Sequence, residues 1–198
     1  MKILDNITNT VRDDLRVEIK KGSRVSIAAA CFSMYAYKEL KKQLETIDEF
    51  EFIFTSPTFV KEKAEKQKRE FYIPRISRET SLYGTEFEIK LRNEMTQRAI
   101  AKECADWIRR KATFKSNTTG ENMAGFMTVD SGAAQTAYMP IGGFTTVDIG
   151  CERGNNSYNM VNCMEAPFAQ QYMQLFDGLW NDREKMQDVT DMVLENIR

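Results

Sequence analysis

The stretch Val25-Ser26-Ile27-Ala28-Ala29-Ala30-Cys31-Phe32 decides the fold, because all of its side chains except that of Ser26 are apolar or small. A short apolar run of this kind predicts a strand that is covered on both faces, as in a parallel sheet. A helical pattern follows, with Ala36, Leu40 and Leu44 on one side, and Phe52-Ile53-Phe54 is the next buried strand. A strand, a helix and a strand in this order predict an α/β layer with a right-handed crossover.

Apolar residues also recur at helical spacing on both sides of this unit. The spacing predicts an opening helix over 7–19, a long helix over 87–108 and two further helices over 168–179 and 186–197. In the third of these we expect the following residues to face inward: Phe168, Tyr172, Leu175, Phe176 and Leu179. We expect one domain over 1–198, with roughly 181–198 as the start of a helical linker.

From residue 121 onward the pattern changes to short apolar runs separated by glycines. These runs predict strands over 123–129, 134–139, 144–149 and 158–161, because glycine at such intervals marks the bends between strands. No run approaches the roughly 18 apolar residues that a membrane span needs. We therefore expect a cytoplasmic protein without a membrane partner.

The chain of 198 residues contains no histidine. This excludes a self-contained Ser-His-Asp or Cys-His enzyme and every zinc site that uses histidine. The four cysteines are far apart and form no CxxC pair, so the sequence indicates neither a metal site nor a disulfide framework. No P-loop with its Gly-Lys-Ser/Thr end is present, so we expect no nucleotide cofactor in this chain.

The net charge of −1 hides an uneven distribution along the chain. Residues 61–111 hold 14 Lys/Arg against 9 Asp/Glu, whereas residues 112–198 hold 5 against 11. A basic stretch of this kind can neutralise phosphates. The candidate contacts to nucleic acid are Lys61, Lys63, Lys66, Lys68, Arg69, Arg109, Arg110, Lys111 and Lys115. The alternative is an ordinary solvated helix, because glutamates are interleaved with the cations at helical spacing.

Three segments carry a resemblance to a known family: Ser23–Phe32, Phe52–Pro57 and Leu175–Trp180. Together with the order of the elements, they resemble the phospholipase D-like superfamily. More narrowly, the chain is similar to the degenerate module of that kind at the N-terminus of bacterial Snf/Swi-type helicases. The resemblance implies an α/β/α sandwich around a mixed, largely parallel sheet.

The catalytic signature of that family is H-x-K-x-x-x-x-D on a strand. Its histidine and lysine lie two residues apart, so both face one phosphate. Aligning Asp130 with the aspartate of the signature places Met123 at the histidine and Gly125 at the lysine. Phe144 and Thr145 keep part of the turn that follows, whose serine and asparagine are lost. A thioether and a hydrogen atom cannot form a phosphoenzyme, so this site is predicted to be inactive.

The resemblance therefore implies a binding module rather than an enzyme. The first hypothesis is that it binds nucleic acid, without sequence specificity, for an ATP-driven motor encoded beyond Arg198, where ATP and Mg²⁺ would be needed. The second is a homodimer or another protein-interaction module. The third is a phosphodiesterase that works without histidine.

Overall fold

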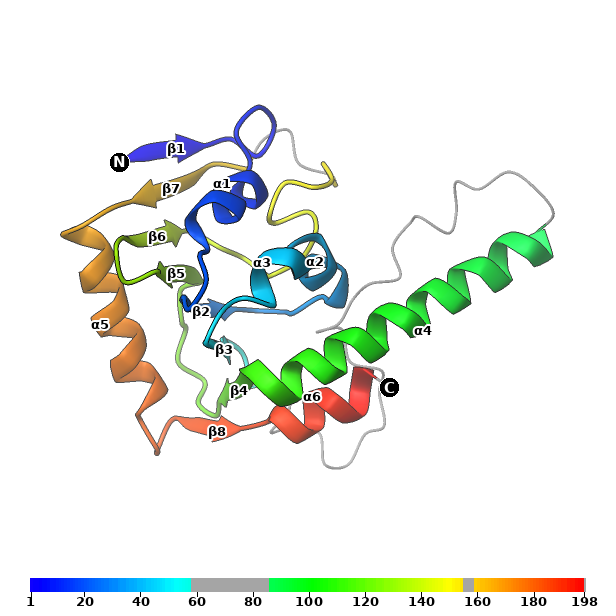
Figure 1. Cartoon of the computed structure of the whole chain (residues 1–198). Coiled ribbons are helices and arrows are strands. Elements are labelled where there is room, and N and C mark those ends of the chain that lie inside the picture. Colours follow the sequence, from blue (N-terminus) through cyan, green and yellow to red (C-terminus); the bar gives the residue numbers. More distant parts are fainter. Residues whose placement is uncertain (58–85, 155–158, 198) are drawn as a thin grey trace.

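A computed structural model describes residues 1–57, 86–154 and 159–197, with the side chains of 86–94 excluded. In these residues the backbone forms one mixed sheet of eight strands in the order β1-β7-β6-β5-β2-β3-β4-β8 (Figure 1). The strands are β1 (Lys2–Leu4), β2 (Arg24–Ala29), β3 (Glu49–Phe54), β4 (Ala112–Asn117), β5 (Phe126–Asp130), β6 (Gln135–Met139), β7 (Val161–Met164) and β8 (Met186–Asp188).

The predicted α/β layer is confirmed, but the prediction of a largely parallel sheet is wrong. Only β2 with β3 and β3 with β4 pair in parallel, and every other neighbouring pair is antiparallel. The reason is the length of the connections. Parallel neighbours need a crossover, which the helical segments supply only between β2, β3 and β4. The glycine-marked bend at Ser131–Ala134 is too short for anything except an antiparallel hairpin.

Helices cover both faces of the sheet (Figure 1). They are α1 (Val11–Glu18), α2 (Met34–Glu39), α3 (Lys41–Leu44), α4 (Glu86–Lys111), α5 (Phe168–Trp180) and α6 (Thr190–Ile197). Alternate residues of a strand face opposite sides. Accordingly, Val25 and Ile27 pack in the larger core cluster with α1 to α4, whereas Ala28 packs with Phe176 of α5.

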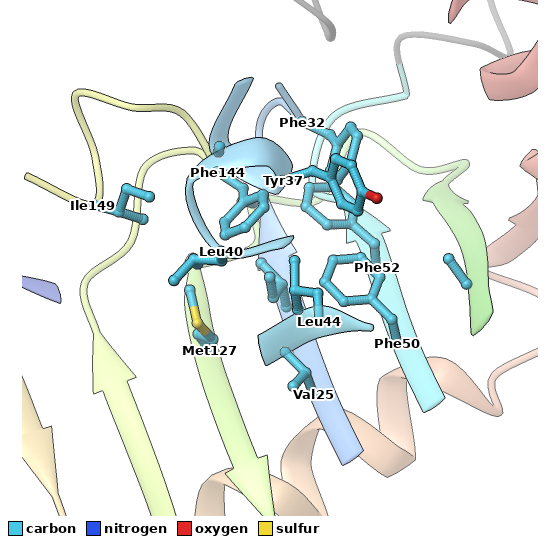
Figure 2. Packing of buried hydrophobic residues seen from close by; sticks show 14 of the residues in the cluster. Val25, Phe32, Tyr37, Leu40, Leu44, Phe50, Phe52, Met127, Phe144 and Ile149 are labelled. Carbon is cyan, nitrogen blue, oxygen red and sulfur yellow. The ribbon is translucent and has the colours of Figure 1, made fainter. Parts of the chain in front are cut away.

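Aromatic rings fill the larger core, as Figure 2 shows. Phe32 lies edge-on to Phe52 and stacks on Phe144, with ring centroids 5.8 and 5.7 Å apart. Trp107 of α4 packs on Phe50 at 4.8 Å, and its indole Nε1–H donates to the Leu44 carbonyl at 2.9 Å. This hydrogen bond satisfies the polar atom of a fully buried ring and fixes α4 against α3.

Several boundaries differ from the sequence predictions. The opening helix begins only at Val11, because Thr10 caps it by accepting a hydrogen bond from the Asp13 N–H at 3.1 Å. Ile7 lies outside the helix and is exposed. In place of a strand over 144–149, Phe144 makes a single bridge to Phe32 and a turn follows. Of the strand predicted over 158–161, Tyr158 lies outside the described residues and the observed strand begins at Val161.

The carboxyl-terminal segment also departs from expectation. Residues 181–198 were expected to start a helical linker, but β8 pairs with β4 and α6 buries Val193 in the main core. On α5, Phe176 faces inward as predicted, whereas Phe168 and Leu175 are 55% and 52% exposed. The buried residues of α5 are Ala169 and Phe176. Phe168 and Leu175 each precede one of them and therefore point about 100° away from the sheet, so the buried side of the helix is rotated relative to the predicted side. None of the described helices has the length and apolarity needed to cross a bilayer.

One charged network lies within the sheet face that α5 covers. Arg24 Nε donates to Glu51 Oε1 at 2.7 Å, and its Nη2 donates to Asp177 Oδ1 of α5 at 2.7 Å. The Glu51 side chain is only 4% exposed. Burial raises the pKa of Glu51, and the neighbouring Arg24 opposes this rise. Arg24 therefore both neutralises a buried carboxylate and connects α5 to the sheet.

Candidate nucleic-acid interface

Met123 and Gly125, which the resemblance aligns with a catalytic histidine and lysine, lie just before β5 rather than on it. Met123 packs at the margin of the α5 cluster, and Gly125 is the last residue before the strand. A Cβ atom on Gly125 would lie 1.8 Å from the Ile141 carbonyl oxygen, and the Ile141 N–H donates to the Gly125 carbonyl at 3.0 Å. The backbone of residue 141 thus occupies the space that any side chain at position 125 would need.

The turn at 141–148 closes over the end of β2. The Ala30 N–H donates to Gly142, and the Phe144 N–H donates to Cys31, at 2.9 and 2.8 Å. Gly143 lies so close that a Cβ atom there would be 2.6 Å from Cys31 Sγ and 2.8 Å from Asp148 Oδ2. The end of β2 is therefore filled by the chain itself, with a thiol and a carboxyl group facing the same point.

Asp148 is held by this turn. Its carboxyl accepts the Thr145 hydroxyl at 2.5 Å, and the N–H groups of Gly143 and Thr145 also donate to it. Burial raises the pKa of Asp148, while these hydrogen bonds oppose the rise. Where it is ionised, this carboxylate repels a phosphate at the end of β2. Asp130, which the resemblance aligns with the aspartate of the signature, lies at the other end of β5, where it accepts hydrogen bonds from the Gly132 N–H and from Gln135 Nε2.

Three of the four cysteine thiols have raised pKa values. Burial raises the pKa of Cys151 to about 11 and that of Cys163 to about 12, so both thiols are protonated at neutral pH. Burial also raises the pKa of Cys104. Among the described residues, no three His, Cys, Asp or Glu side chains are grouped so as to hold a metal ion.

The structure describes four of the nine predicted basic contacts. Lys61, Lys63, Lys66, Lys68 and Arg69 lie outside the described residues. Lys111 Nζ donates to the Ile47 carbonyl at 2.7 Å. Lys115 Nζ donates to the Trp180 carbonyl at 2.9 Å and lies 4.4 Å from the centre of that ring. These two lysines hold secondary-structure elements together, and Lys115 does so on the opposite face of the sheet from Trp107 and α4.

Arg109 and Arg110 remain on the surface at the end of α4. Arg109 pairs with Asp106 at 3.0 Å and Arg110 pairs with Glu45 at 2.8 Å, and all four side chains are partly exposed. Exposed ion pairs of this kind contribute only about 0.2–1 kcal/mol. A phosphate can therefore replace either carboxylate at little cost.

The structure adds two cations that the sequence analysis did not single out. Arg98 and Lys102 are exposed on α4. Lys102 follows Arg98 by four residues, and Arg109 follows Arg98 by eleven. At about 100° per residue these three share one side of the helix, over a length of about 16 Å. We call them the α4 stripe. Their spacing was the signal that could have identified them, because Ile100, Cys104 and Trp107 occupy the buried side.

Comparison with known proteins adds no assignment. No family model matches the chain, and a search of curated proteins finds no similar sequence. What the molecule does must therefore be argued from its geometry: a strand end that the chain itself fills, and three exposed cations on one helix.

Proposed function

We propose that the chain is a non-catalytic module that binds nucleic acid through the α4 stripe. The observation that carries the proposal is that the exposed side chains of Arg98, Lys102 and Arg109 lie within about 40° of one another around α4, with the buried Ala105 between Lys102 and Arg109. Lysine and arginine side chains in a line neutralise successive backbone phosphates and release counterions. Such contacts give affinity without reading the bases.

The shape of α4 supports this proposal. The amino-terminal part of the helix extends beyond the sheet, whereas its carboxyl-terminal part is anchored through Trp107 (Figure 1). Residues 112–198 carry 11 Asp/Glu and 5 Lys/Arg, and α6 of this acidic segment packs against α4. A duplex is therefore expected to approach α4 from a side that α6 leaves open. The uneven distribution of charge on the protein thereby orients the approaching duplex.

We further propose that the module is a member of the phospholipase D-like superfamily that has lost its catalytic residues. Two features support this: the backbone leaves no room for a side chain at Gly125, and Met123 has a thioether where the family has its histidine. In that setting the module holds nucleic acid for a Snf/Swi-type motor, which would supply ATP hydrolysis with Mg²⁺ from a separate domain. The described part of this chain contributes binding and position, not turnover.

The proposal is tested by removing the α4 stripe. The triple variant R98Q/K102Q/R109Q is expected to bind a labelled duplex of about 20 base pairs about tenfold more weakly or worse at low salt, because three phosphate contacts are lost. Fluorescence anisotropy measures the dissociation constant. All three side chains are exposed, so the fold is expected to be unchanged in circular dichroism.

A matched control removes three positive charges elsewhere. Lys20, Arg153 and Arg183 are exposed and lie off α4, so K20Q/R153Q/R183Q lowers the net charge by the same amount. This control is expected to keep most of the affinity. If both triple variants lose the same affinity, binding depends only on net charge and the α4 stripe is not the interface.

One observation favours a second function, a protein-interaction or homodimerisation module. Phe168 and Leu175 on α5 are 55% and 52% exposed. Large apolar side chains on one helix surface are typical of contacts with another protein. A monomer in light scattering at high concentration would count against self-association.

A further inference from the structure

A second basic feature lies next to the end of α4. A surface hollow of about 630 Å³ opens between α1, α2 and α3, and four cations line it: Arg16, Lys38, Lys41 and Lys42. This volume is in the range of pockets that hold small ligands, about 300–1,000 Å³. The hollow is connected to α4 because Lys41 pairs with Glu103 at 2.9 Å.

The two carboxylates of the hollow are already neutralised. Glu39 lies 3.5 Å from Arg16 Nη2 and 3.9 Å from Arg12 Nη1. Glu45 accepts from Arg110 at 2.8 Å and from the Tyr37 hydroxyl at 3.1 Å. The Arg110 guanidinium and the Tyr37 hydroxyl hold the pKa of Glu45 below its usual range despite the opposing effect of burial. Neither carboxylate therefore cancels the lysines.

The remaining cations of the hollow to be considered are Lys38 and Lys42. Both are exposed, and in the part of the chain that the structure describes neither forms an ion pair. Gln43 lines the same hollow, and its Oε1 is buried with no hydrogen-bond partner among the described residues. The hollow thus offers two ammonium groups to a ligand.

We propose that this hollow binds a phosphate monoester, either the terminal phosphate of a nucleic-acid strand or that of a free mononucleotide. The proposal deepens the proposed function, since the hollow lies beside the helix that is to carry the nucleic acid. A terminal phosphate bears about −1.5 to −2 charges at pH 7 and three acceptor oxygens. Two lysines match that charge better than the single charge of a backbone diester. The concave shape also favours an end group over a continuous backbone.

The experiment compares two duplexes of about 12 base pairs that differ only in a 5′-terminal phosphate or hydroxyl, by competition anisotropy. A parallel arm titrates adenosine monophosphate into the protein and follows binding by calorimetry. The variant is K38Q/K42Q, and the control is R153Q/R183Q, which removes the same charge away from the hollow. Lys38 and Lys42 are exposed, so both variants are expected to fold.

We expect wild-type protein to prefer the phosphorylated duplex or to bind the mononucleotide, and K38Q/K42Q to weaken that binding about tenfold, which corresponds to about 1.4 kcal/mol. A preference in the duplex arm identifies a strand end as the source, and binding in the other arm identifies a free nucleotide. If the wild type shows neither, or if K38Q/K42Q retains both, the inference is overturned. The hydroxyl duplex reports on the proposed function separately, because its binding depends on the α4 stripe.

Discussion

Replacing Gly125 by alanine is expected to destabilise the protein by about 3–5 kcal/mol, a loss seen only where a buried backbone or core must move. The added Cβ would lie 1.8 Å from the Ile141 carbonyl oxygen and 3.1 Å from the Ala28 carbonyl oxygen. Both neighbours are backbone atoms and cannot turn away as a flexible side chain can. The hydrogen bond from the Ile141 N–H to Gly125 would also be strained. Urea unfolding followed by circular dichroism measures the change.

Gly120→Ala is the matched control, because no atom lies within 4 Å of a Cβ there and its φ is not positive. It is expected to leave stability within about 0.5 kcal/mol of the wild type. The same steric clash at position 125 affects M123H/G125K, the variant that introduces the histidine and lysine of the phospholipase D-like signature. We expect this variant to destabilise the fold rather than to produce phosphodiesterase activity. A stable M123H/G125K protein that hydrolyses bis-p-nitrophenyl phosphate would show that position 125 has room for a side chain.

The second large effect is expected from Arg24→Ala, at about 3–5 kcal/mol near neutral pH. The variant leaves the Glu51 carboxylate, 4% exposed, without its cation, and it removes the contact of the sheet with Asp177 on α5. The loss is expected to shrink as the pH falls. Burial already raises the pKa of Glu51, and without Arg24 this pKa rises further, so the buried group takes up a proton more readily.

The direction of this pH dependence follows from the linkage between proton binding and folding. A carboxyl whose pKa is higher in the folded than in the unfolded state stabilises the fold below its unfolded pKa, and this contribution is lost as the pH rises through the folded pKa. The double variant R24A/E51Q removes the buried charge as well and is expected to recover much of the stability at neutral pH. If R24A and R24A/E51Q are equally unstable at every pH from about 5 to 8, the buried charge is not the cause.

The parts of the fold that depend on local apolar patterns could be predicted from the sequence. The runs around Ile27 and Phe52 became the central parallel strands, and the inward positions Cys104 and Trp107 of the long helix are buried. The direction of the other strands could not be predicted in the same way, because a short apolar run has the same pattern in a parallel and in an antiparallel pair. Tertiary pairing also decided the end of the chain, where Met186 joined a strand rather than a helix.

The candidate site was less accessible to sequence reasoning. A basic stretch of sequence shows the total charge, but it does not show which cations form hydrogen bonds within the fold. Lys115 is an example, because its Nζ donates to the Trp180 carbonyl. The resemblance aligned Gly125 with a lysine, but only the three-dimensional structure shows that the Ile141 backbone fills the space beside this position. The hollow at Lys38 and Lys42 arises from three helices and has no signature in any one of them.

The most direct measurement is the affinity of the unmodified protein for a hydroxyl-ended duplex across a salt series from about 50 to 300 mM. We predict a linear fall of the logarithm of the association constant with the logarithm of the salt concentration. The three phosphate contacts of the α4 stripe give a slope of about −3. An affinity that does not change with salt, or no binding even at the lowest salt, would contradict the claim that this chain holds nucleic acid by its phosphates.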